Sequence, residues 1–214
     1  ASLRSELGEE HEFEFVQGTI EWPMASGLEP ISNPNETYYA YFEYTPESAL
    51  AAVEALERYI SVEGPFDGIL AFSQGAGLAI MFLLRYCSLP PQRSPLFKCA
   101  LLFSPTGMYD PVAWINTGTI QKVDTTDRVT LTIASIVVWG EQDLDGVSED
   151  SGVAARLFDS DMVWIHVHNR GHEIPSAASV EAFRGMMRYI RRAITLARVL
   201  AHSDRVAQQT HPRS

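Results

Sequence analysis

The sequence predicts an α/β fold with a mostly parallel central sheet and helices on both of its faces. Short apolar runs alternate along the chain with segments of helical periodicity, which is typical of parallel strands joined by crossover helices. Of the 214 residues, 46% are hydrophobic, which is enough to bury one sizeable core. We therefore expect a single domain over 1–214, ending in a flexible tail over about 203–214.

Five runs of the sequence are strand candidates, because each is short and mostly apolar. In chain order they are FEFV (13–16), GILAF (68–72), CALLF (99–103), SIVVW (135–139) and VWIHV (163–167). Runs of this kind are expected in a sheet that helices cover on both sides.

Two segments carry the clearest helical signals. In TPESALAAVEALERYI, Thr45 is a suitable N-cap and Pro46 suits the first helical position. The apolar residues of this segment recur at helical spacing, on one stripe made of Leu50, Val53, Leu56 and Ile60. The last long helix is expected from Ser176 to about Ala201.

Ser73 lies at a corner between an expected strand and an expected helix, in FDGILAFSQGAGLA. A strand that turns directly into a helix crowds the corner and requires small neighbours, here Ala71 and Gly75, with Gly77 letting the helix approach the strand. This A-x-S-x-G pattern is a form of the nucleophile elbow, which exposes the serine hydroxyl. The turn would also point the backbone amide of Gln74 at an oxyanion formed there.

An acid and a histidine follow Ser73 in the order that such a serine needs. Asp143 comes after the run SIVVWG, and His172 comes after VWIHVH. A serine hydroxyl needs an imidazole to accept its proton, and the imidazole needs a carboxylate to hold its tautomer. Ser73, Asp143 and His172 are therefore the predicted catalytic residues, with Asp145 as the alternative acid.

Two metal-binding alternatives have less support in the sequence than the triad of Ser73, Asp143 and His172. His166 and His168 form an H-x-H pair near His172, but no Asp accompanies the third histidine, so we expect these two side chains to be packed or hydrogen-bonded at a strand end. DLDGVSED lacks the third early ligand and the flanking helices of a calcium loop. We expect no metal, and a solvated acidic loop containing Asp145, Glu149 and Asp150.

Composition excludes several classes of partner. The net charge of −11 argues against nucleic acid, which requires a basic surface. No run resembles a signal peptide or a membrane span of about 20 apolar residues. Cys87 and Cys99 are too few for a disulfide framework and are expected to be small buried hydrophobes. We expect a soluble, cytoplasmic protein that binds neither nucleic acid nor membrane.

These motifs resemble a family of small α/β-hydrolases, the family of serine hydrolases, which includes ovarian-cancer-associated hydrolases and fungal polyketide-releasing thioesterases. The resemblance covers most of the chain and rests on GPFDGILAFSQGAGLA, YYAYFEYTPE, VVWGEQD and GHEIPS. It implies an α/β-hydrolase fold and a triad of Ser73, Asp143 and His172. It also implies hydrolysis of esters or thioesters with hydrophobic acyl groups, without metal or cofactor.

The chain departs from that family at two places. Ala71 stands where the family usually has Gly, which adds one methyl group to a crowded elbow. Family members begin with a strand that ends in a His-Gly loop and donates the second oxyanion amide, whereas this chain starts at ASLRSELGEEHEFEF. We therefore expect the first strand to be absent from the given chain, so that the second oxyanion donor is unassigned.

The predicted function is hydrolysis of a hydrophobic small-molecule ester or acyl thioester through a Ser73 acyl-enzyme, as in a thioesterase of polyketide biosynthesis. One alternative is hydrolysis of a C–C bond in a β-diketone by the same triad. Another is a hydrolase-like fold used only as a binding module.

Two groups of residues are candidates for the substrate side. Pocket lining is expected from a set of aromatic and Met residues: Trp22, Met24, Tyr38, Tyr39, Tyr41, Phe42, Met108, Tyr109 and Trp114. A basic face for docking an acyl carrier protein is offered by Arg184, Arg188, Arg191 and Arg192, at helical spacing. The alternative for these arginines is an ordinary solvated helix surface.

Overall fold

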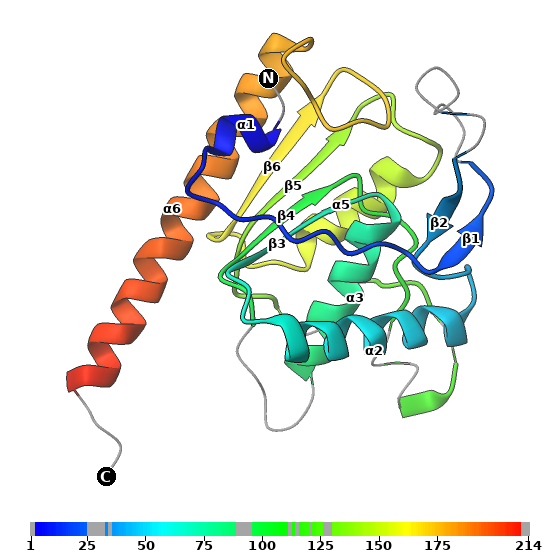
Figure 1. The fold of residues 1–214 in the computed structure, drawn as a ribbon, viewed down its shortest axis with the longest axis horizontal. Coiled ribbons are helices and arrows are strands. Elements are labelled where there is room, and N and C mark those ends of the chain that lie inside the picture. Colours follow the sequence, from blue (N-terminus) through cyan, green and yellow to red (C-terminus); the bar gives the residue numbers. More distant parts are fainter. Residues whose placement is uncertain are drawn as a thin grey trace.

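The computed structural model shows how the chain is arranged around one parallel sheet (Figure 1). It describes residues 3–24, 33, 36–88, 96–110, 113, 116–119, 121–125 and 130–210, and side chains only up to residue 203. Trp114, one of the pocket candidates, lies outside the described residues.

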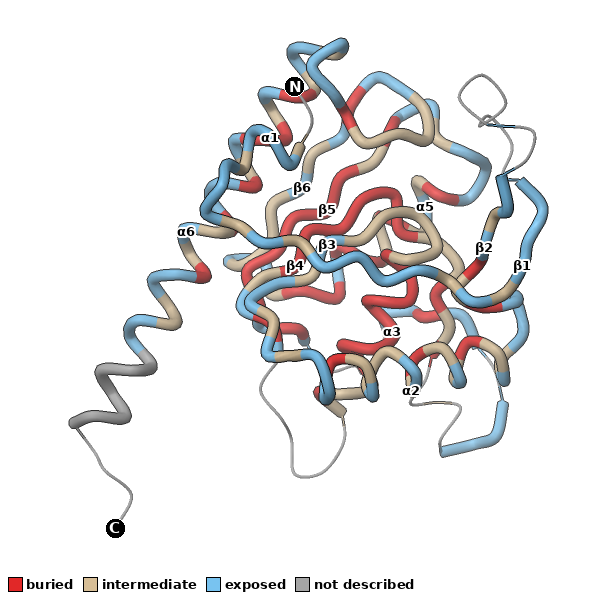
Figure 2. The backbone as a smooth tube through the Cα atoms, viewed as in Figure 1, coloured by how far each residue is buried: buried red, intermediate tan, exposed pale blue. Residues whose placement is uncertain are grey.

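Four strands form the central sheet in the order β3-β4-β5-β6, and all are parallel. Their bounds are β3 Gly68–Phe72, β4 Cys99–Phe103, β5 Ala134–Gly140 and β6 Val163–His168. Four of the five predicted strands are thereby confirmed, to within a residue at each end. Buried residues are concentrated in β4, β5 and α3 (Figure 2), whereas β3 and β6 are the outer strands of the sheet.

The fifth strand prediction, FEFV at 13–16, is wrong. This segment has no strand pairing and crosses the molecule as an extended chain after α1 (Leu3–Leu7). The Arg4 guanidinium lies 5.4 Å from the ring centroids of both Phe13 and Phe15. The aromatic residues of the segment 13–16 therefore contact the Arg4 guanidinium, and the segment does not pair with a strand.

Helices cover both faces of the sheet, as predicted. On one face, α2 (Pro46–Glu63), α3 (Gln74–Ser88) and α5 (Val147–Arg156) pack in the larger hydrophobic cluster. On the other face, α6 (Val180–Thr210) packs with α1 over the opposite side chains of the strands. The apolar strands are thus buried between two helical layers, which is the reason for their nearly continuous hydrophobic sequence.

The helix signals were read correctly at the start of α2 but not at the end of α6. Thr45 is the N-cap of α2 and accepts from the Ser48 amide, with Pro46 at the first turn. The last helix begins at Val180, after the predicted start at Ser176, and continues to Thr210, beyond the predicted end near Ala201. Because no Gly or Pro follows until Pro212, nothing in the sequence stops the helix earlier.

Several short elements were not predicted. β1 (Ile20–Trp22) and β2 (Tyr38–Ala40) form a small antiparallel pair beside the main sheet. The expected acidic loop is largely helical, since α5 begins at Val147. Within it Asp150 is not solvated as expected, because it accepts from the hydroxyl of Thr106 at 3.1 Å and the amide of Gly107 at 3.3 Å.

Candidate active site

Ser73 occupies the turn between β3 and α3 with a left-handed backbone, at φ 55°. Its amide donates to the Phe103 carbonyl at 2.8 Å, and its own carbonyl accepts from Gly77 at 3.1 Å, so the turn is held from both sides. A Cβ on Gly77 would lie 2.0 Å from the Thr106 carbonyl oxygen. The close approach of α3 to the segment after β4 therefore requires glycine at position 77, where the sequence analysis expected a close approach to a strand.

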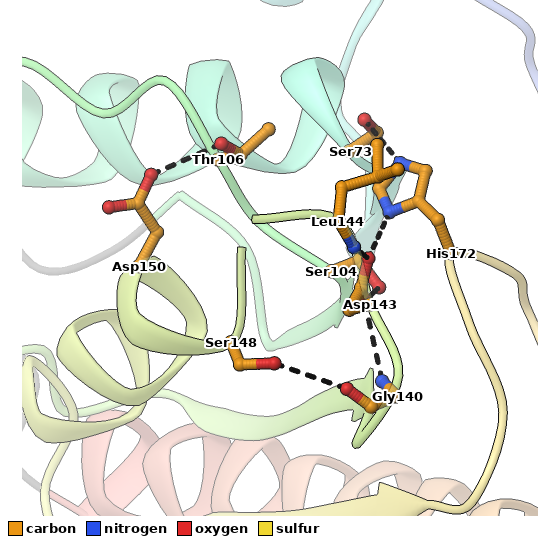
Figure 3. A network of polar contacts seen from close by, with 9 residues as sticks. All are labelled: Ser73, Ser104, Thr106, Gly140, Asp143, Leu144, Ser148, Asp150 and His172. Carbon is orange, nitrogen blue, oxygen red and sulfur yellow. Dashed lines mark hydrogen bonds and ion pairs between the residues drawn. The ribbon is translucent and has the colours of Figure 1, made fainter. Parts of the chain in front are cut away.

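The structure brings Ser73, His172 and Asp143 together in one chain of hydrogen bonds (Figure 3). His172 Nε2 lies 2.8 Å from Ser73 Oγ, and His172 Nδ1 lies 2.6 Å from Asp143 Oδ1. The imidazole also packs on the Phe72 ring, with 4.7 Å between the ring centroids. These groups follow β3, β5 and β6, whose carboxyl ends meet at the same edge of the sheet.

The Asp143 carboxylate is fully buried, with a side-chain exposure of 0%, and is held by donors on both oxygens. Oδ1 accepts from the Leu144 amide at 2.8 Å as well as from His172, and Oδ2 accepts from Ser104 Oγ at 2.7 Å and from the Gly140 amide at 3.3 Å. Burial by itself raises the pKa of this carboxyl, but the hydrogen bonds from Ser104, Leu144 and His172 outweigh it, and the pKa is lowered. Asp143 is therefore ionised at neutral pH.

An ionised Asp143 accepts a hydrogen bond from the Nδ1–H of His172, which leaves Nε2 as the acceptor for the Ser73 hydroxyl. Because the folded-state pKa lies below the unfolded one, ionisation of Asp143 stabilises the fold above the unfolded pKa. That contribution is lost as the pH falls through the folded value.

The other candidate residues lie outside this chain of hydrogen bonds. Asp145 is exposed. His166 Nε2 lies 2.9 Å from the Ala182 carbonyl, and its ring centroid is 6.4 Å from that of His168, which is buried. In the described part of the chain, no group of three or more His, Cys, Asp or Glu side chains is arranged to hold a metal ion.

Two of the pocket candidates belong to the core. Phe42 is 0% exposed and Met108 is 3% exposed, and both pack in the larger hydrophobic cluster, so they cannot line an open pocket. Trp22, Met24 and Tyr39 are exposed. The difference could not be read from residue type, because core and pocket use the same apolar side chains.

Gln74 has a second role that the sequence analysis missed. Its backbone amide begins α3 beside Ser73, as predicted, and its side chain holds the segment before α2. Oε1 accepts from the Tyr41 amide at 2.9 Å, and Nε2 donates to the Phe42 carbonyl at 2.9 Å. The Tyr41 ring in turn covers Gly75, where a Cβ would lie 3.1 Å from it. The side chain thus ties this segment to the nucleophile turn.

We expect Gln74→Leu to destabilise the fold, because the Tyr41 amide and the Phe42 carbonyl would lose their hydrogen bonds while remaining partly buried. Each unsatisfied group should cost about 1–3 kcal/mol of the free energy of unfolding. Urea denaturation would measure this, with Gln17→Leu as a control, since Gln17 is exposed. Equal midpoints for the two variants would contradict the structural role of this side chain.

Ser104 was also missed by the sequence analysis, although a signal was present. It follows β4 and donates to Asp143, and its backbone is left-handed like that of Ser73, at φ 45°. The strands β3 and β4 both end in Phe followed by Ser, as LAFS and LLFS, and the two phenylalanines, Phe72 and Phe103, are paired in the sheet. Two neighbouring parallel strands with the same ending place two serines at the same edge, which the sequence could have indicated.

Comparison with known proteins identifies the family. A family model described as "Serine hydrolase (FSH1)" matches residues 1–183. The chain belongs to this serine hydrolase family. The sheet and its helical layers accordingly constitute an α/β-hydrolase fold, and family membership supports hydrolase activity.

Several relatives of this serine hydrolase are named as esterases or hydrolases. "Esterase FPY3" of Fusarium mangiferae is 30% identical over 203 residues, which are 92% of this chain and 89% of that protein. "Hydrolase phiM" of a fungal species is 29% identical over 76% of this chain and 70% of its own. "Esterase OVCA2" of Mus musculus is 30% identical over 60% of this chain and 51% of its own.

The described helices of the serine hydrolase include none that is both long and apolar enough to cross a membrane.

Proposed function

We propose that this serine hydrolase cleaves a small hydrophobic ester or acyl thioester, with Ser73 as nucleophile, His172 as general base and acid, and Asp143 as the partner that orients His172. The observation that carries the proposal is the unbroken hydrogen-bond path from Ser73 Oγ through both ring nitrogens of His172 to the buried Asp143 carboxylate. Each of the three groups has the neighbour that its role requires.

In the proposed reaction, Ser73 Oγ attacks the acyl carbon as its proton passes to Nε2 of His172. The negative charge on the carbonyl oxygen would be stabilised by the Gln74 amide at the start of α3. As the tetrahedral intermediate collapses, His172 returns the proton to the leaving alcohol or thiol. Water, deprotonated by the same nitrogen, then attacks the acyl-enzyme, releasing the acid and restoring the Ser73 hydroxyl.

The printed names of the relatives, "Esterase FPY3" and "Esterase OVCA2", support an ester as the substrate. An acyl thioester uses the same steps with a thiol as the leaving group. A role in polyketide biosynthesis remains part of the proposal through the resemblance to polyketide-releasing thioesterases, and a cytoplasmic location remains an expectation.

Three of the four arginines considered as a docking face for an acyl carrier protein contact other side chains of the protein. Arg191 forms an ion pair with Glu6 at 3.3 Å, so its charge is partly offset by that carboxylate. Arg188 and Arg192 both lie over the Tyr189 ring, at 5.0 and 5.7 Å from its centroid. Arg191 is thus paired with an acid, whereas Arg188 and Arg192 keep their charge beside Tyr189, and we propose a small-molecule substrate.

The proposal predicts that a fluorophosphonate probe labels the wild-type protein on Ser73 and that acyl esters or thioesters are hydrolysed. Intact-protein mass spectrometry would detect the added mass, and peptide mapping would locate it. A parallel screen of aryl esters and acyl thioesters of increasing chain length would define the acyl group. A folded protein that is neither labelled nor active on any of them would instead support the binding module.

A further inference from the structure

The hydroxyl of Ser104 contacts the oxygen of Asp143 that faces away from His172. Ser104 Oγ lies 2.7 Å from Oδ2, and His172 Nδ1 lies 2.6 Å from Oδ1. Rotation of the carboxylate about its last bond would therefore break both contacts together. The two oxygens are held in separate directions, and the plane of the carboxylate is fixed with respect to the imidazole (Figure 3).

The backbone of Ser104 is built for this contact. Its amide donates to the Val138 carbonyl at 2.7 Å, which ties the end of β4 to β5, and the residue is 0% exposed. Its φ of 45° is in the left-handed region, which residues other than glycine rarely adopt. A glycine would occupy this position more readily, so the serine brings a hydroxyl to the site in spite of a backbone strain.

A buried carboxylate needs such a donor for two reasons. Removal from water penalises its charged form, and hydrogen bonds from the protein offset that penalty. The hydrogen bond from Ser104 lowers the pKa of Asp143 more than the hydrogen bonds from Leu144 and His172 do. The Gly140 amide is a more distant donor to the same oxygen, at 3.3 Å.

We propose that Ser104 is a positioning residue, whose hydroxyl holds the Asp143 carboxylate in register with His172. It acts through Asp143 and does not contact the reacting atoms. The inference rests on the function proposed above, because it takes Asp143 to be the acid partner of His172.

Two variants separate the hydroxyl from the backbone strain. Ser104→Ala removes the hydroxyl and keeps the strained conformation, whereas Ser104→Gly removes both. We expect kcat to fall about tenfold in each, which is the effect of losing one hydrogen bond to a charged group. KM should be unchanged, because Ser104 does not touch the substrate. The glycine variant also guards against an alanine variant that fails to fold.

Ser135 provides a matched control. It too is a fully buried serine, and its hydroxyl donates to the carbonyl of Ile133, just before β5, at 2.8 Å. This contact lies at the start of β5, whereas His172 meets Asp143 beyond the end of that strand. Ser135→Ala should therefore lower stability while leaving kcat within about twofold of wild type. A general effect of removing a buried hydroxyl would lower kcat in all three variants, and would overturn the specific role of Ser104.

A second measurement does not depend on turnover. The carboxyl carbon resonance of Asp143, assigned by its absence in Asp143→Asn, can be followed by NMR as the pH is lowered. Without the hydrogen bond from Ser104 the pKa of Asp143 should rise, so the resonance should titrate at higher pH in Ser104→Ala than in the wild type. In Ser135→Ala the titration should be the same as in the wild type.

The outcomes distinguish the inference from the proposed function. An active wild type with unchanged kcat in both Ser104 variants would overturn the role of Ser104 and leave the proposed function standing. A wild type that is neither labelled nor active would overturn the proposed function, and the titration would then decide whether Ser104 holds Asp143. An unshifted titration would overturn the contact itself.

Discussion

Ser73→Ala is expected to reduce turnover of any acyl substrate by at least roughly a thousandfold, because it removes the hydroxyl that lies against His172 Nε2 and would attack the carbonyl. Alanine keeps the Cβ of serine, so the left-handed turn at φ 55° and its backbone hydrogen bonds should be retained. The variant should be folded, with a circular dichroism spectrum and an unfolding midpoint close to wild type.

Ser148→Ala is the comparison for Ser73→Ala. Ser148 is near the site, but its hydroxyl donates to the Gly140 carbonyl at 3.2 Å (Figure 3). Its removal should leave initial rates within about twofold of wild type. Turnover by Ser73→Ala above about a thousandth of the wild-type rate would rule out Ser73 as the nucleophile.

Asp143→Asn is expected to lower kcat by roughly three to four orders of magnitude with little change in shape. The substitution removes the negative charge that stabilises the imidazolium formed when His172 takes the Ser73 proton. In addition, an amide NH₂ turned toward Nδ1 would favour the tautomer that carries its proton on Nε2, which cannot accept from serine. Pre-steady-state acylation rates on an aryl ester would measure the loss.

Asp145→Asn separates the two acids that the sequence offered. Asp145 is exposed, so its substitution should change the acylation rate by no more than about twofold. A large loss in Asp145→Asn together with a small one in Asp143→Asn would reverse the assignment of the acid.

Local sequence was sufficient for the four strands of the parallel sheet and for the corner at Ser73. Buried parallel strands are continuous apolar runs, and a strand-to-helix corner demands small residues at fixed offsets from the serine. The order of the chain also placed Asp143 and His172 after later strands. Since parallel strands end at one edge of a sheet, that order was enough to predict their meeting with Ser73.

Only the tertiary structure decided which polar groups support that arrangement. The repeated Phe-Ser could have placed Ser104 at the edge of the sheet, but not against Asp143, 39 residues away. The Gln74 side chain likewise reaches a backbone amide 33 residues away, so neither contact leaves a pattern at short range. The segment 13–16 has the composition of a strand but does not pair, because pairing depends on a partner elsewhere in the chain. The sequence predicted a solvated Asp150, but α5 places this residue against Thr106. Burial of a charge depends on what packs beside it, which the local sequence does not show.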